Sequence, residues 1–144
     1  MRIREARPED AEGLAALLAD LGYPDVPERV AARAERFAAE PDSCLLVAEE
    51  EGGLAGLASA SVLPLAHEDG SWCRLSALVV AEGRRRSGIG RALVEAVEAF
   101  ARSRSCTLVE VTSGEREERA AAHRFYAGLG YEQVSKRYLK PLVP

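Results

Sequence analysis

The segment from Trp72 to Thr112 constrains the fold more than any other part of the chain. It opens with a strand predicted over Trp72–Val80, whose last six residues are apolar on both faces, as in the centre of a sheet. A helix predicted over Gly88–Arg104 follows, because apolar residues recur there at helical spacing, and a second apolar strand is predicted over Cys106–Thr112. A strand–helix–strand unit of this kind crosses over right-handedly, so the two strands are expected to be parallel.

The other elements follow from the same hydrophobic periods and from turn residues between them. In chain order, these patterns predict a strand over Arg2–Ala6, a helix ended by Gly22, a helix over Glu28–Ala39, strands over Ser43–Glu49 and Leu54–Leu63, a helix over Arg119–Leu129 and a closing strand over Tyr131–Leu139. The order β-α-α-β-β-β-α-β-α-β predicts an α/β fold with a central mixed sheet and helices on both faces. No linker or repeat interrupts the 144 residues, so a single domain over 1–144 is expected.

Charge and composition argue against several classes of function. A net charge of -4 at pH 7 disfavours a general nucleic-acid binder. No apolar run approaches the ~20 residues of a membrane span, and the N-terminus lacks a signal-peptide core. The three cysteines have no metal-ligand spacing with each other or with either histidine, so we expect reduced thiols and no metal site. These features predict a cytoplasmic protein that binds neither nucleic acid nor membrane. We expect a monomer or homodimer.

Positive charge gathers in the loop between the central strand and the long helix. Arg84, Arg85, Arg86 and Arg91 lie within a stretch of eight residues of this acidic chain. The two glycines of the loop permit a tight turn and a close approach of a ligand to the main chain. The amides of the first helical turn lack helical partners and point along the positive end of the helix dipole, an arrangement that binds pyrophosphate. A P-loop would need a Lys followed by Ser or Thr, and the dinucleotide fingerprint would need a third Gly where Leu93 stands.

The loop instead satisfies the pattern [Arg/Gln]-x-x-Gly-x-[Gly/Ala] through Arg85, Gly88 and Gly90. This pattern resembles the acetyl-CoA binding motif of the GNAT N-acetyltransferase superfamily. The segment Ala122–Tyr131, with its Phe-Tyr pair and Leu-Gly-Tyr exit, is similar to the last helix and turn of that family. The predicted order of elements is also the family's order over nearly the whole chain.

The resemblance implies roles for particular residues. The backbone of Leu78, Val79 and Val80 would pair with the pantetheine arm of acetyl-CoA, and the Val79 amide would stabilise the oxyanion of the tetrahedral intermediate. Tyr126 would be the general acid that protonates the departing CoA thiolate. The pyrophosphate would be held by the loop and the first helical turn, which comprise Arg85, Arg86, Ser87, Gly88, Ile89, Gly90 and Arg91.

Two positions depart from the pattern of the family. Several members carry a Glu base on the central strand, where this chain has Arg74, and many carry an Asn seven residues ahead of the tyrosine, where it has Arg119. The base is therefore open, and the candidates are ordered water, Glu110, His67, Glu68 and Asp69.

The function implied is transfer of an acetyl group from acetyl-CoA to a primary amine, carried by a small molecule or a peptide, in a ternary complex. The alternative is a non-catalytic acyl-CoA sensor or interaction module on the same fold. Neither hypothesis requires a metal ion.

Overall fold

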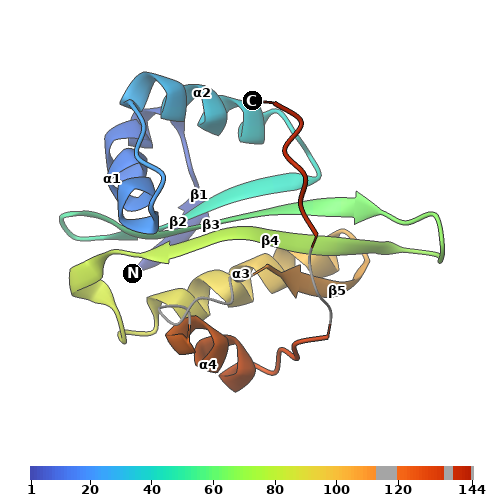
Figure 1. Ribbon diagram of the computed structural model, residues 1–144. Coiled ribbons are helices and arrows are strands. Elements are labelled where there is room, and N and C mark those ends of the chain that lie inside the picture. The colour runs from blue at the N-terminus through green and yellow to red at the C-terminus, as the bar shows by residue number, and fades with distance from the viewer. Residues whose placement is uncertain (113–119, 135–137, 144) are drawn as a thin grey trace. The chain divides into compact units, whose positions relative to one another are not determined.

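The computed structural model describes residues 1–112, 120–134 and 138–143 (Figure 1). It divides the chain into two compact units, Met1–Thr112 and Ser113–Pro144. The first unit carries the sheet and the second unit carries the last helix.

The first unit is built on a five-stranded sheet in the order β1-β2-β3-β4-β5. The strands are β1 (Arg2–Glu5), β2 (Ser43–Glu50), β3 (Gly53–Pro64), β4 (Ser71–Val80) and β5 (Cys106–Val111). The first four are antiparallel neighbours, whereas β5 runs parallel to β4. The predicted mixed sheet is confirmed, and so is the parallel pair joined by a helical crossover.

Helices cover both faces of this sheet, as predicted (Figure 1). On one face lie α1 (Ala11–Leu21) and α2 (Pro27–Ala38), and on the other lies α3 (Ile89–Ser103). Two short 3-10 helices complete the unit, η1 (Pro8–Asp10) before α1 and η2 (Glu82–Arg84) after β4. The α1/α2 layer buries Leu14, Leu17, Val30 and Ala34 against Val47, Leu57 and Val79 of the sheet.

The buried side of α3 begins at its first residue. Ile89 is 1% exposed and Leu93 is fully buried, and Val94, Val97 and Ala101 continue the same stripe. Gly88 precedes the helix in the left-handed conformation, with φ 85°, which a glycine adopts without strain. The start of α3 is therefore fixed against the sheet by packing.

The strand β4 changes its pairing part-way along its length. Against β3, Leu75 pairs with Ala60 and Ala77 pairs with Ser59, so Ser76 is an extra residue in a β-bulge. The Ser76 hydroxyl lies 2.8 Å from the Ser59 hydroxyl and also donates to the Ser59 carbonyl oxygen at 3.3 Å. Against β5, the pairing ends where Leu75 meets Val111. From Ser76 onward, β4 has a strand neighbour only on the β3 side within the described residues.

The second unit contains α4 (Ala120–Gly128). The helix ends where the Leu129 and Tyr131 amides both donate to the carbonyl oxygen of Tyr126, followed by Gly130 at φ 90°. The expected helix over Arg119–Leu129 is thus found from Ala120, whereas Arg119 and the loop before it lie outside the described residues.

The predicted closing strand over Tyr131–Leu139 is not found where it can be checked. Residues 131–134 and 138–143 form no strand, and 135–137 lie outside the described residues. The segment has apolar residues that a strand could use, but a strand also needs a hydrogen-bonded neighbour. The described part of this segment has none, and Val134, Tyr138 and Leu139 are exposed.

Candidate functional site

The backbone of β4 presents an open edge beyond the point where β5 leaves it. The Ala81 amide donates to the Ala55 carbonyl oxygen at 2.8 Å, on the β3 side. The Val79 carbonyl oxygen also faces β3, since it lies 3.0 Å from where a Cβ on Gly56 would stand. Backbone groups of successive strand residues point in opposite directions, so those of Leu78 and Val80 face the open edge. An extended ligand can pair with these two residues as a further strand would.

The loop after this edge has an unusual backbone. Arg86 adopts the left-handed conformation with φ 65°, which is unfavourable for a residue with a side chain, and Gly88 follows at φ 85°. The Ser87 hydroxyl closes the turn by donating to the Arg84 carbonyl oxygen. These features turn the main chain back so that it enters α3 directly.

The four arginines of this region have different partners. Arg84 forms an ion pair with Glu50, and Arg91 contacts Glu95 one turn further along α3 at 2.9 Å. Arg85 and Arg86 are exposed, and neither forms an ion pair within the described residues. Of the predicted basic cluster, these two guanidinium groups are therefore the ones most available to an anion.

The first turn of α3 carries amides that the helix does not use. The first helical hydrogen bond runs from the Ala92 amide to the Gly88 carbonyl oxygen at 3.0 Å, and no side chain caps the helix. The amides of Ile89, Gly90 and Arg91 thus have no partner within the helix, and they lie at the positive end of its dipole. These amides follow the open edge of β4 within the first unit, so the residues present fit a ligand with an extended arm and a phosphate group.

Tyr126, the predicted general acid, lies on α4 in the second unit. Its ring makes edge-to-face contacts with Phe125, at a centroid distance of 5.2 Å, and with Tyr131, at 5.8 Å. The aromatic pair recognised in the sequence therefore belongs to a small aromatic cluster within that unit.

The candidate bases fall into two groups. Glu110 accepts a hydrogen bond from Arg74 Nε at 2.6 Å, between neighbouring positions of β4 and β5. Glu68 accepts one from Trp72 Nε1 at 3.3 Å, and the His67 ring lies 5.6 Å from that of Trp72. The ion pair was missed from the sequence, although both residues alternate with apolar neighbours in adjacent strands. Detecting it required the register of a parallel pair, which the sequence alone does not fix.

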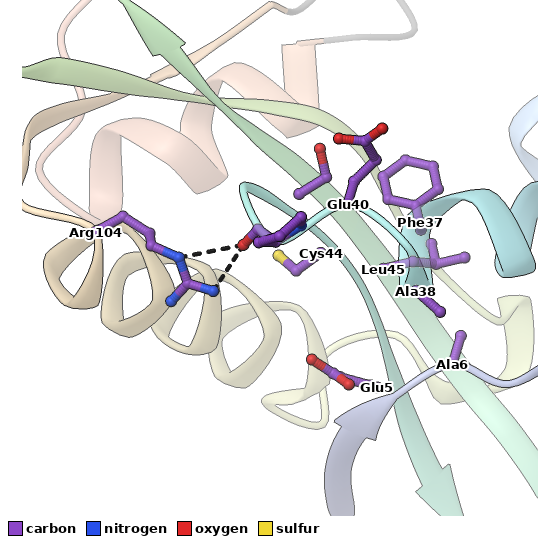
Figure 2. Close-up of a pocket in the computed structure, with 10 residues that line it drawn as sticks. Glu5, Ala6, Phe37, Ala38, Glu40, Cys44, Leu45 and Arg104 are labelled. Carbon is purple, nitrogen blue, oxygen red and sulfur yellow. Dashed lines mark hydrogen bonds between the residues drawn. The ribbon is translucent and has the colours of Figure 1, made fainter.

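A small pocket lies at the other end of the sheet. Figure 2 shows its lining, which includes Phe37, Cys44 and Arg104, and its volume is about 100 Å³. Arg104 closes one side by donating to the Pro41 carbonyl oxygen at 2.7 and 3.2 Å. Burial raises the pKa of the Cys44 thiol to about 12, so this cysteine stays protonated and unreactive at neutral pH. The pocket borders the start of β2, whereas the open edge of β4 lies opposite the start of β3. The pocket is therefore separate from the candidate site at the open edge of β4.

Two kinds of feature are absent from the described residues. No group of three or more His, Cys, Asp or Glu side chains is placed to hold a metal ion there. None of the helices in that part of the chain has the length and apolar character needed to cross a bilayer.

The profile of the acetyltransferase (GNAT) family matches residues 11–131. The chain belongs to the GNAT family. The expected family membership is therefore confirmed, and with it the assignment of the chain to the acetyltransferases.

Relatives of this GNAT chain include two that are named aminoglycoside N(6')-acetyltransferase type 1. The protein from Klebsiella aerogenes is 32% identical over 108 residues, covering 72% of this chain and 70% of the relative. The protein from Stenotrophomonas maltophilia is 29% identical over 150 aligned positions, covering 99% of this chain and 94% of the relative. The solved structure of an Agrobacterium tumefaciens protein superposes with a TM-score of 0.86 at 25% identity, covering 98% of this chain and 99% of that one.

Proposed function

We propose that this GNAT protein transfers an acetyl group from acetyl-CoA to a primary amine. The observation that carries the proposal is the open edge of β4, which leads into the uncapped first turn of α3. An extended pantetheine arm and a pyrophosphate are joined in CoA in the same order. Acetyl-CoA is made and used inside cells, so we also propose that the protein acts in the cytoplasm.

The first unit supplies the residues that would hold acetyl-CoA. Leu78 and Val80, with Val79 between them, present the backbone groups along which the arm would lie. The pyrophosphate would be bound by the Ile89, Gly90 and Arg91 amides, with Arg85 and Arg86 adding charge-assisted hydrogen bonds and Ser87 and Gly88 shaping the turn. The bound thioester supplies an activated acetyl group.

The register of β4 selects the amide that would stabilise the oxyanion. The Val79 backbone faces β3, so we assign this role to one of its neighbours, Leu78 or Val80. The thioester lies at the end of the arm that is remote from the pyrophosphate, and Leu78 is the neighbour further from the loop. We therefore propose the Leu78 amide as the oxyanion donor.

In the transfer, the amine nitrogen forms a bond to the acetyl carbon and the carbon–sulfur bond breaks. The nitrogen loses one proton to water or a base, and the sulfur gains one. We propose Tyr126 as the donor of that second proton, because a tyrosine hydroxyl, with a pKa of ~10 in short peptides, can donate to a thiolate whose conjugate acid titrates near ~8.5.

The binding site can be tested at Gly90, whose backbone would approach the pyrophosphate. The Gly90→Leu variant places a bulky side chain over the unused amides but keeps a residue that helices tolerate. We expect acetyl-CoA binding, measured by titration calorimetry, to weaken at least about tenfold, which corresponds to roughly 1.4 kcal/mol. Gly83→Ala is the matched control, because no atom lies within 4 Å of the added Cβ. Unchanged affinity in folded Gly90→Leu would refute the pyrophosphate assignment.

The names of the two relatives make aminoglycosides with a 6'-amine the first acceptors to test. A panel that also includes a polyamine, amino acids and a peptide with a free N-terminus covers the other amine classes on this fold. Release of the CoA thiol identifies the acceptor.

A further inference from the structure

The Arg74–Glu110 ion pair lies on a defined face of the sheet. Arg74 pairs across β3 with Ser61, and Ser61 shares a face with Leu57, which is buried under α1 and α2. Arg74 therefore belongs to the face that these two helices cover elsewhere. Its side chain is 48% exposed, so α1 and α2 do not reach over it.

Glu110 uses only one of the donors of Arg74. The contact is made by Nε at 2.6 Å, and no other partner of Arg74 is found in the described part of the chain. A guanidinium has five N–H donors in one plane, so the four on Nη1 and Nη2 remain for a ligand. This forked arrangement matches the two oxygens of a carboxylate or the oxygens of a phosphate. The Ser61 hydroxyl, which lies 2.9 Å from that of Ser43, stands at the cross-strand position next to it.

Arg74 also lies on the strand that would carry the acetyl group. Leu78 lies four positions further along the strand, beyond the bulge at Ser76, so the separation along the strand is at most roughly 13 Å. The α3 face of β4 is occupied by that helix, and α1 and α2 cover the opposite face at Val79, so the part of that face open to an acceptor is the stretch around the exposed Arg74 side chain. One small acceptor can then reach Arg74 with one group and the thioester with its amine.

Glu110 contributes by fixing the orientation of Arg74. An exposed arginine samples many rotamers, and holding it at Nε reduces the entropy lost when Nη1 and Nη2 bind a ligand.

We propose that Arg74 binds an anionic group, a carboxylate or a phosphate, on the amine acceptor, and that Glu110 is the positioning residue for Arg74. The inference rests on the proposed transferase function and specifies the acceptor class. The acceptor is an amine that also carries an acidic group, and in this respect it differs from the aminoglycosides for which the two relatives are named.

The test compares acceptors that differ only in the acidic group. Lysine and cadaverine differ by a carboxylate, and O-phosphoethanolamine and ethanolamine differ by a phosphate. We expect the wild-type protein to prefer the acidic member of at least one pair by about tenfold or more in kcat/KM. The pair that shows the preference identifies which anion Arg74 binds.

In the Arg74→Gln variant, the preference should fall at least about tenfold through a higher KM, with kcat nearly unchanged. Glu110→Ala should reduce the preference as well, whereas Glu110→Gln should retain more of it, because its amide oxygen can still accept the Nε hydrogen. If the ion pair were merely structural, these substitutions would change kcat/KM equally for all acceptors, or would change the melting temperature alone. Arg102→Gln, which changes an exposed arginine at the far end of α3, is the matched control.

Several results would overturn the inference. Equal use of both members of both pairs by the wild-type protein would do so, and so would a preference that survives in folded Arg74→Gln. Amine-dependent turnover restricted to acceptors without an acidic group would remove the inference and leave the proposed function intact. Acetyl-CoA binding without turnover of any amine would remove the proposed function, and the inference with it.

Discussion

Leu78 and Val79 are neighbours in β4, yet their backbone groups face opposite edges of the strand. The Val79 amide lies on the side that pairs with β3, and the Leu78 amide lies on the side that β5 leaves open. A proline lacks the amide hydrogen, so it removes a different interaction at each position. Proline substitution at the two positions can therefore distinguish an amide that acts in catalysis from an amide that stabilises the sheet.

We predict that Leu78→Pro lowers kcat/KM by about 100-fold, the usual effect of losing one oxyanion donor. Val79→Pro should instead lower the melting temperature, because it removes a hydrogen bond of the β3–β4 ladder. Steady-state kinetics and thermal unfolding of the two variants check this pair. The reverse result, with Leu78→Pro active and Val79→Pro stable, would contradict the assigned register.

The cysteines make a second prediction at the level of residues. Burial raises the pKa of Cys44 to about 12 and that of Cys73 to about 11. In the unfolded chain both thiols ionise near pH ~8.5, so the unfolded state loses these protons first as the pH rises. The contribution of the protonated thiols to stability is complete below that pH and declines between about pH 9 and pH 12.

Urea unfolding measured from pH 8 to pH 10.5 should therefore show a falling free energy of unfolding. The fall should be smaller in the Cys44→Ala/Cys73→Ala double variant than in the wild-type protein. Alkylation at pH 8 should modify both thiols in urea but neither in the folded protein. Rapid alkylation of Cys44 or Cys73 in the folded protein would contradict the burial of the two side chains, whereas the partly buried Cys106 is not part of this test.

Among the elements, β3 and α3 meet at Gly56. A Cβ added there would stand 3.0 Å from the Val79 carbonyl oxygen and 3.0 Å from Leu93 Cδ1. The carbonyl oxygen belongs to the backbone of β4 and cannot move away without disturbing the strand pairing. Gly56 thus allows the start of α3 to pack closely against the strand whose edge would bind acetyl-CoA.

We predict that Gly56→Ala lowers the free energy of unfolding by about 1–3 kcal/mol, as overpacking usually does. Acetyl-CoA affinity should fall as well, because the strain acts on both β4 and the first turn of α3. Chemical unfolding and calorimetry measure the two effects, with Gly83→Ala again as the control. A variant with wild-type stability and affinity would show that this close packing has no role.

The elements differ in how far the sequence predicted them. The periods of α3, β4 and β5 specified their types and nearly their boundaries, since each buries a stripe or a face that fixes its pattern. Three features depend on the register between strands that are distant in the sequence: the end of β4–β5 pairing at Leu75, the bulge at Ser76 and the Arg74–Glu110 pair. A one-residue shift in register changes all three, and no local pattern determines it. The same limit explains why the amide expected to act, that of Val79, is assigned here to Leu78.

For the molecule as a whole, the proposed roles are divided between two units. The first unit holds the open strand edge, the loop with Arg85 and Arg86, and the unused amides of α3. The second unit holds Tyr126. The net charge of -4 opposes the approach of an anion, so the local positive charge at the start of α3 is needed for acetyl-CoA to bind. Because the residues proposed for binding and for proton transfer belong to different units, mutations should affect acetyl-CoA binding and proton transfer separately.

The most direct test of the central claim is release of the CoA thiol from acetyl-CoA with the amine panel, measured in the wild-type protein and in Tyr126→Phe. We predict thiol release by the wild-type protein that depends on the amine, and a kcat lower by about 100-fold in Tyr126→Phe, as expected for loss of a general acid. Acetyl-CoA affinity should be the same in both proteins. Binding of acetyl-CoA without amine-dependent thiol release in the wild-type protein would contradict the account and favour a sensor of acyl-CoA.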